Sequence, residues 1–186
     1  MRIVSLIVMM FPLVLLASCG ETAKVPDLIS VSAIEPDNNA MLAAYGVRMW
    51  EYEYRMSRAH DFQISAELWG RDSATPVVLL ASSNNKGMMN GKLKVAFLDA
   101  SKSGGEKGKM DLVLNAGAGD VHAIIDDPFG DDISTCYKGG RVEMKSGEEA
   151  VLVIGAKGKG QLDINKAEEI KKTHDKTLII RMKVKS

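Results

Sequence analysis

The chain has 186 residues, and its 24 Lys and Arg balance its 24 Asp and Glu, so the formal net charge at neutral pH is zero. Without a basic excess, the composition argues against binding to nucleic acid or to anionic lipid headgroups. The two cysteines are Cys19 and Cys136, and the length that follows Cys19 suits one domain with its own hydrophobic core.

Residues 1–18 have the layout of a secretory signal peptide. Met1-Arg2 gives a positive start, Ile3 to Leu16 is mostly apolar, and the small residues Ala17 and Ser18 follow. The apolar run is shorter than the roughly 20 residues that a membrane-spanning helix needs. The segment therefore predicts a cleaved signal rather than a permanent transmembrane helix.

The end of this segment, Leu16-Ala17-Ser18-Cys19, resembles the lipobox of bacterial lipoproteins. The resemblance implies that Cys19 receives a diacylglycerol thioether and becomes the mature N-terminus. The alternative is an ordinary signal peptide with a cysteine there by chance. A lipid would hold the protein on the cell membrane or the outer membrane, facing outside the cytoplasm. Gly20 takes the place of the Asp that resembles an inner-membrane retention signal, which favours the outer membrane where the cell has one.

Residues 19–27 are predicted as a short lipid-attached tether, and residues 28–186 as a single domain. Side chains alternate between apolar and polar over Phe62–Trp69, Leu93–Phe97 and Leu178–Lys185, which is the pattern of strands with one buried face. Further strands are expected at Leu28–Ile34, Tyr45–Met56, Val77–Ser82, Met110–Asn115, Val121–Ile125, Ser134–Tyr137, Arg141–Met144 and Ala150–Ile154.

Turn residues separate these strands. Asn90-Gly91 predicts a hairpin turn, and Lys138-Gly139-Gly140 is expected to join two neighbouring strands. Residues 103–105 and 155–160 are rich in glycine and are predicted as loops. A short surface helix is expected over Lys166–Lys172, capped by Asp163 or Asn165, and Asn38–Ala44 is a weaker helix candidate.

Many short strands and one helix predict an all-β fold, namely an antiparallel β-sandwich with immunoglobulin-like architecture and one short surface helix. The chain shows no regular alternation of strands and helices, which argues against a parallel α/β sheet. The Cys–Trp–Cys core of immunoglobulin domains is missing, so the comparison concerns architecture alone.

An acidic segment is the first candidate site. Asp126, Asp127, Asp131 and Asp132 flank Pro128 and Gly130, and crowded carboxylates repel one another unless a cation neutralises them. Ca²⁺ binds six to eight oxygens from flexible loops, so these four residues are candidate Ca²⁺ ligands. Their spacing differs from that of an EF-hand, and the alternative is a solvated loop between two strands.

An aromatic ladder is the second candidate. Trp50, Tyr52 and Tyr54 share one face of a predicted strand, and Phe62–Trp69 is expected to pair with that strand through a turn at Ser57–Asp61. With Trp69, these side chains are a candidate surface for a glycan or a protein partner of the cell envelope. The alternative is that the aromatic side chains pack in the core.

Signals for an enzyme are weak. The sequence has neither a Gly-x-Ser-x-Gly nor a His-Glu-x-x-His motif. His122 has Asp120 and Asp126 nearby in the sequence but is predicted as a strand histidine without a catalytic role, and Cys136 as a small buried residue. A carboxylate pair for glycan hydrolysis stays open because fold geometry, not sequence spacing, sets such pairs.

Together these observations predict a non-catalytic, lipid-anchored binding or assembly module of the bacterial cell envelope, which contacts its partner through sheet edges or an aromatic patch. Two alternatives stay open. One is a surface hydrolase that acts on glycan or peptide through Asp or Glu. The other is a Ca²⁺-dependent ligand-binding module.

Overall fold

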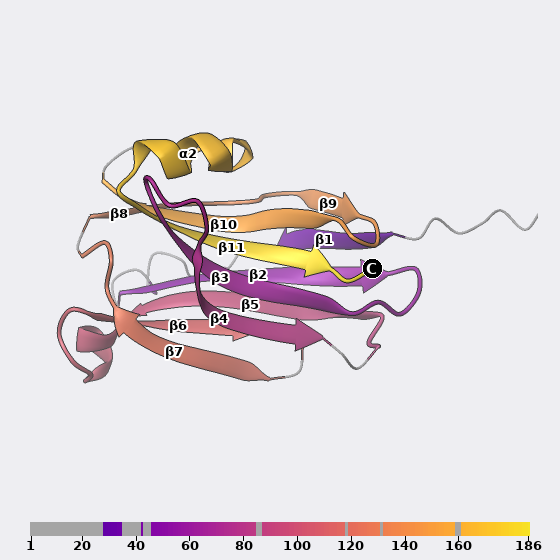
Figure 1. Ribbon diagram of the computed structural model, residues 1–186. Helices are drawn as coiled ribbons and strands as arrows, with labels where there is room; N and C mark the ends of the chain where they lie inside the picture. Colours follow the sequence, from indigo (N-terminus) through magenta and orange to yellow (C-terminus); the bar gives the residue numbers. More distant parts are fainter. Residues whose placement is uncertain are drawn as a thin grey trace, which may run out of the picture.

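The computed structural model describes residues 28–34, 42, 46–84, 87–117, 119–130, 132–158 and 161–186. These residues form two antiparallel β-sheets that lie face to face, with the short helix α2 (Ala167–Thr173) on the outside (Figure 1). The predicted all-β sandwich is therefore confirmed. The signal peptide, Cys19, the tether over residues 19–27 and most of the weaker helix candidate Asn38–Ala44 lie outside the described residues.

The first sheet consists of β1 (Ile29–Ile34), β2 (Val47–Met56), β5 (Asn90–Asp99), β6 (Lys109–Asn115), β7 (Asp120–Asp126) and β9 (Arg141–Met144). The strand order is β7-β6-β5-β2-β1-β9. On its outer face, Glu51 lies opposite Lys94 and Glu53 lies opposite Lys92. Opposite charges at directly facing positions favour this register.

The second sheet consists of β3 (Phe62–Gly70), β4 (Val77–Asn84), β8 (Ile133–Tyr137), β10 (Glu149–Lys157) and β11 (Lys176–Val184). The strand order is β4-β3-β11-β10-β8. The central strand of this sheet, β11, is the last strand of the domain, and it lies between β3 and β10. The sheet is therefore complete only when the C-terminal strand of the domain is in place.

Alternate side chains of both sheets meet in one core. The strand β2 contributes Trp50, Tyr52, Tyr54 and Met56, all buried, and Trp50 packs edge-on against Phe97 of β5. The Tyr52 hydroxyl donates a hydrogen bond across the core to the Leu152 carbonyl at 2.7 Å. Burying each side chain of this size contributes about 1.5–3 kcal/mol, so the period-two pattern is the main source of stability.

A second, smaller cluster lies on the outer face of the second sheet. Ala167 and Ile170 of α2 pack against Ile154 of β10 and Ile179 of β11. The Asp163 side chain accepts a hydrogen bond from the Asn165 backbone N–H, which starts a 3₁₀ turn at Ile164–Lys166 just before α2. The predicted surface helix is present, but the predicted cap is not its own: Asp163 caps the 3₁₀ turn, and the N-cap residue of α2, Lys166, makes no side-chain capping bond.

The predicted hairpin turn at Asn90-Gly91 is wrong. Both residues lie inside β5, where Gly91 faces Tyr54 of β2. A Cβ atom at position 91 would lie 2.7 Å from the Tyr54 hydroxyl oxygen and 2.9 Å from its ring. Glycine is therefore required because the Tyr54 ring packs directly on the backbone, not because the chain turns there.

The strand pairings also differ from expectation at two places. Phe62–Trp69 does not pair with the Trp50 strand, because β3 lies in the second sheet between β4 and β11. The segment Lys138-Gly139-Gly140 joins strands of different sheets. Its Lys138 N–H donates to the Leu152 carbonyl, and its Gly140 carbonyl accepts from the Ala33 N–H, so the chain changes sheets here.

The predicted loop over residues 155–160 begins too early, since β10 continues to Lys157. A Cβ atom at Gly155 would lie 3.2 Å from the Ile133 side chain of β8 and 3.7 Å from the Phe97 ring. The glycine allows β8 and the core to approach the β10 backbone closely. Here, as at Gly91, a close packing contact explains a glycine that resembles a loop residue in the sequence.

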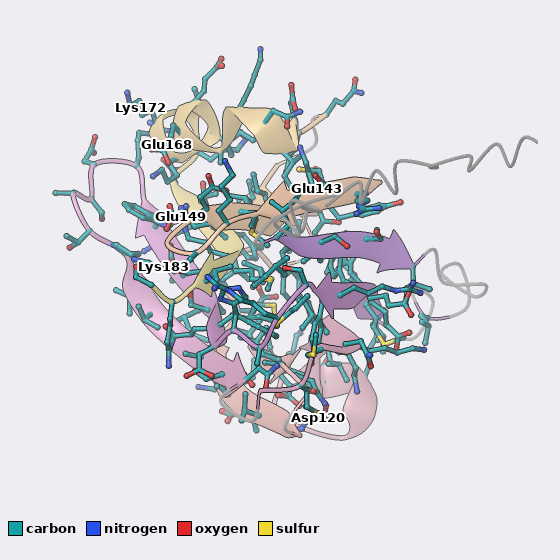
Figure 2. The ribbon with its side chains drawn as sticks, turned by 90° about the vertical axis from the view of Figure 1, so that its right-hand side faces the viewer. Asp120, Glu143, Glu149, Glu168, Lys172 and Lys183 are labelled. Carbon is teal, nitrogen blue, oxygen red and sulfur yellow. The ribbon has the colours of Figure 1, made fainter. Side chains whose placement is uncertain are left out.

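The connection from β7 to β8 crosses one end of the sandwich, on the left in Figure 1. Phe129, in the middle of this crossover, is buried and belongs to the main core. Figure 2 is turned so that the opposite end faces the viewer, with Glu168 and Lys172 of α2 at the top and Asp120 of β7 at the bottom. The crossover therefore closes the end that faces away in Figure 2.

Candidate functional site

Three of the four residues of the predicted aromatic surface are buried and do not form such a surface. Trp50, Tyr52 and Tyr54 are 8%, 1% and 0% exposed and lie between the sheets. The phase of β2 that carries them is the core-facing phase, because the opposite phase carries Glu51, Glu53 and Arg55. These side chains pack in the core and do not present a ligand or partner surface.

Trp69, the fourth residue, is half-buried on the outer face of β3 beside α2. The Lys171 ammonium of α2 lies 3.7 Å from the centre of its ring, and its indole N–H donates to Glu67 at 3.3 Å. Glu67 also pairs with Arg181 of β11. Trp69 thus belongs to a network of interactions that holds α2 against the second sheet. Its role in the described structure is therefore structural.

The aspartates of the acidic segment interact with different partners. Asp126 pairs with Lys109 at 2.6 Å, and this lysine holds the pKa of the Asp126 carboxyl below its usual range. The Asp127 carboxylate accepts the Phe129 N–H at 2.9 Å, and the Asp132 carbonyl accepts the Gly158 N–H at 2.6 Å. Asp131 lies outside the described residues.

Within the described ranges, no group of three or more His, Cys, Asp or Glu side chains is arranged to hold a metal ion. The Asp126 side chain instead pairs with Lys109, and the Asp127 side chain binds local backbone. The segment therefore has a structural role in the described part of the chain, since it carries Phe129 across the end of the core.

The groups considered for catalysis are also separated. His122 lies on the exposed face of β7, where its Nδ1 is 3.4 Å from Asp111. Its charge contributes, after the hydrogen bond from Asn115, to the lowered pKa of Asp120. Cys136 is a free, half-buried cysteine, and burial raises the pKa of its thiol to about 11. A thiol with this pKa is protonated at neutral pH and is a poor nucleophile. Cys136 packs under the helix, in the second cluster, and not between the sheets.

The carboxyl groups with displaced pKa values do not resemble a hydrolase pair. Among the described residues these are Asp99, Asp120 and Asp126, and all three pKa values are lowered. Hydrogen bonds are the first cause in each case, from Ser101, Asn115 and Lys109 respectively. A general acid at neutral pH needs a raised pKa, so these groups do not favour the hydrolase alternative.

One edge of the second sheet carries exposed apolar side chains. Val77 and Val78 at the start of β4 are 62% and 59% exposed. Edge strands of this kind are the sheet edges that the sequence favoured as contact surfaces. No other feature of the described residues indicates which partner would cover these two valines.

A cavity of about 170 Å³ opens at the end of the sandwich that the β7–β8 crossover closes. We call it the end cavity. Its apolar walls are Phe97 of β5, Met110 of β6 and Ile133 of β8, so both sheets contribute to it. Gly130 of the crossover and Gly46, just before β2, also line it. The volume suits a ligand of a few non-hydrogen atoms, since drug-sized ligands occupy about 300 Å³ or more.

Four charged residues line the end cavity: Arg48, Asp99, Lys102 and Asp127. The Asp99 carboxylate accepts hydrogen bonds from the Ser101 N–H and hydroxyl, and with the nearby Lys102 charge these bonds lower its pKa. Asp127 caps the crossover turn as described above. Both carboxylates are therefore already engaged in shaping the turns on which they lie.

Arg48 is a functional candidate that was not predicted from the sequence. It lies in the core-facing phase of β2, with Trp50, Tyr52 and Tyr54. Its guanidinium donates across the sandwich to the Thr135 hydroxyl of β8 at 3.3 Å. The signal was present in the sequence: a charged residue continues the phase that the aromatic residues mark as buried.

The described part of the chain is thus an antiparallel β-sandwich with a small polar–apolar cavity at one end. No protein-family model matches the chain, and no curated protein or solved structure is significantly similar to it. None of the helices among the described residues is long and apolar enough to cross a membrane.

Proposed function

We propose that the protein is a lipid-anchored, non-catalytic binding module that faces outside the cytoplasm of a bacterial cell and receives its ligand in the end cavity. The lipobox-like sequence Leu16–Cys19 supports the anchor. The cavity, which both sheets line, supports the binding role. Two acyl chains would hold the protein stably on a membrane, because each buried methylene contributes about 0.8 kcal/mol.

The position of Leu28 carries this proposal. The Leu28 N–H donates to the Ser57 hydroxyl, and its carbonyl accepts the Ser57 N–H, both at 3.1 Å. Ser57 follows the last residue of β2, whereas Arg48 and the end cavity lie at the start of that strand. At ~3.3 Å per residue, Arg48 and Ser57 lie about 30 Å apart. A tether that leads into Leu28 would therefore hold the end cavity away from the membrane.

The first test is fractionation of cells that produce the wild-type chain or Cys19→Ala. The wild type should sediment with membranes and withstand washing with high salt, and Cys19→Ala should be released. Cys136→Ser is the matched control because it removes the other cysteine and leaves the lipobox intact. Equal fractionation of wild type and Cys19→Ala would contradict the anchor.

The orientation is tested with fluorescent labels on the purified full chain in liposomes whose headgroups carry a quencher. In a Cys136→Ser background, Lys145→Cys places the label at the Leu28 end, since Met144 pairs with Ile29. Lys102→Cys places it at the rim of the end cavity. Stronger quenching at position 145 than at position 102 is expected. Equal quenching, or the reverse order, would contradict the proposed orientation.

A further inference from the structure

Arg48 is a cation at the border of the core that forms no ion pair with a described residue. It is half-buried, and its guanidinium lies between the two sheets where it reaches Thr135. A guanidinium has five N–H donors. Thr135 supplies its hydrogen-bond acceptor among the described residues, and none of their carboxylates forms an ion pair with it.

The half-buried position of this charge is unfavourable for the stability of the folded protein. Moving a cation out of water without a partner anion lowers stability, and proteins usually pair a buried or half-buried charge. The two carboxylates that line the end cavity form no ion pair with Arg48: Asp99 accepts a hydrogen bond from Ser101 and lies near the Lys102 charge, and Asp127 accepts the Phe129 N–H. Arg48 lines the open end cavity, and an external anion can approach its remaining N–H donors from there.

Lys102 adds a second positive charge at the rim. Its aliphatic chain packs on Gly46: a Cβ atom at position 46 would lie 2.7 Å from the Lys102 Cδ. Gly46 also has a φ of +70°, so a larger residue there would be both strained and in contact with Lys102. The glycine thus allows the Lys102 side chain to lie against the backbone beside Arg48.

The walls between these charges are apolar. Phe97, Met110 and Ile133 line the same cavity as Arg48. A planar guanidinium binds a carboxylate through two parallel hydrogen bonds, and the apolar walls favour a short hydrocarbon group beside it. The volume of about 170 Å³ restricts the ligand to a few non-hydrogen atoms.

We propose that the end cavity binds a small organic carboxylate, with the carboxylate on Arg48 and its hydrocarbon part against Phe97, Met110 and Ile133. This inference rests on the proposed binding function, and it names the class of ligand. Lys102 offsets the charge of Asp99 at the rim, and Arg48 is the residue that contacts the ligand.

The experiment uses the full chain, purified in a non-ionic detergent, and the probes acetate, butyrate and hexanoate at constant ionic strength. Binding is measured as a saturable rise in Tm, because a ligand that binds the folded state stabilises it. Butyrate should raise Tm, and butanamide, which has the same shape without the charge, should not. Absence of a saturable shift with all three carboxylates up to about 10 mM would overturn the proposal, since a site of this size should bind within that range.

Two variants of Arg48 and one control locate the site. Arg48→Gln removes the charge and should weaken butyrate binding at least about tenfold. Arg48→Lys keeps the charge but lacks the planar fork, and should bind with intermediate affinity. It also serves if Arg48→Gln does not fold. Arg55→Gln, on the same strand but exposed, should bind like wild type. Equal affinity in wild type and a folded Arg48 variant would overturn the proposal.

The outcomes also separate this inference from the proposed anchor and orientation. Loss of butyrate binding does not affect the fractionation of Cys19→Ala or the quenching of the labels. If the three carboxylates fail and inorganic phosphate raises Tm in an Arg48-dependent manner, the cavity binds anions but the carboxylate assignment is wrong. If the anchor fails and butyrate binds, the module lacks the proposed membrane attachment and the ligand class stands.

Discussion

Gly91 shows how a single missing methyl group decides the packing of the core. The Tyr54 ring occupies the space where a side chain at position 91 would begin, and the Tyr54 hydroxyl in turn accepts a hydrogen bond from buried Asn84 at 3.2 Å. A larger residue would displace the ring and this bond together. Position 91 is therefore constrained directly by Tyr54, and Asn84 helps to hold the Tyr54 ring in place.

Gly91→Ala is expected to destabilise the protein by about 1–3 kcal/mol, the usual cost of overpacking a core. Urea unfolding followed by circular dichroism measures this free energy. Gly139→Ala is the matched control, because the nearest atom to a Cβ there is 4.0 Å away, and its effect should stay within about 0.5 kcal/mol. Equal effects of the two substitutions would show that the Tyr54 contact does not restrict position 91.

Tyr52 links stability to alkaline pH. Burial raises the pKa of its phenol well above the usual value, and its hydroxyl donates to Leu152. Below about pH 10 both the folded and the unfolded state keep the phenol proton. Above that pH the unfolded chain loses the proton first, so the unfolded state binds fewer protons and stability falls as pH rises.

Wild type is therefore expected to lose up to about 1.4 kcal/mol of stability per pH unit above pH 10 from this residue. Tyr52→Phe should lack this contribution, and at pH 7 it should be destabilised by about 0.5–1.5 kcal/mol for the lost hydrogen bond. The measurement is urea unfolding at pH 7, 9 and 10.5. A wild type and a Tyr52→Phe that lose the same stability between pH 9 and 10.5 would contradict the prediction.

At the scale of elements, the β7–β8 crossover determines both the end of the core and the end cavity. Phe129 is 2% exposed and inserts into the main core, while Asp127 and Gly130 on either side of it line the cavity. The turn is fixed by the bond from the Phe129 N–H to Asp127. The same short segment thus seals the sandwich and shapes the proposed binding site.

Phe129→Ala should cost about 3–5 kcal/mol, as for other buried phenylalanines. Ile124→Ala in the preceding strand is the matched control, because Ile124 is 70% exposed, and it should change stability by no more than about 0.5 kcal/mol. Thermal and urea unfolding measure both. A small loss for Phe129→Ala would mean that the crossover does not close the core as described.

At the scale of the whole molecule, the two sheets share one core, and the second cluster adds α2 to the outside. In the second sheet, β3 pairs with β11 and β8 pairs with β10. Because these pairings join distant parts of the chain, the described residues should unfold as one cooperative unit. The two tryptophans report on the two clusters separately, since Trp50 is in the core and Trp69 lies beside α2.

Single-tryptophan variants test this cooperativity. Trp69→Phe leaves Trp50 as the reporter of the core, and Trp50→Phe leaves Trp69 as the reporter of the helix side. In each variant, the urea midpoint from fluorescence should coincide with the midpoint from far-ultraviolet circular dichroism. A Trp69 transition at clearly lower urea would instead mean that α2 and its cluster detach before the sandwich unfolds.

The sequence by itself determined the features that depend on local geometry. Side chains alternate across a strand with period two, so the strands and the all-β class were predictable from alternation alone. The helix α2 was predictable because the order of its acidic and basic residues acts within a few residues, and Asp163 caps the 3₁₀ turn just before it. The phase of β2 also marked Arg48 as inward-facing, although its importance was not recognised.

Only the tertiary structure decided which distant residues meet. Gly91 resembles a turn residue until Tyr54 is placed on it, and Lys138–Gly140 resembles a hairpin until its two strands are assigned to different sheets. The end cavity likewise joins Arg48 to Ile133 from the opposite sheet. Strand pairing depends on contacts far apart in the sequence, and no local pattern encodes which partner a strand or a charge will find.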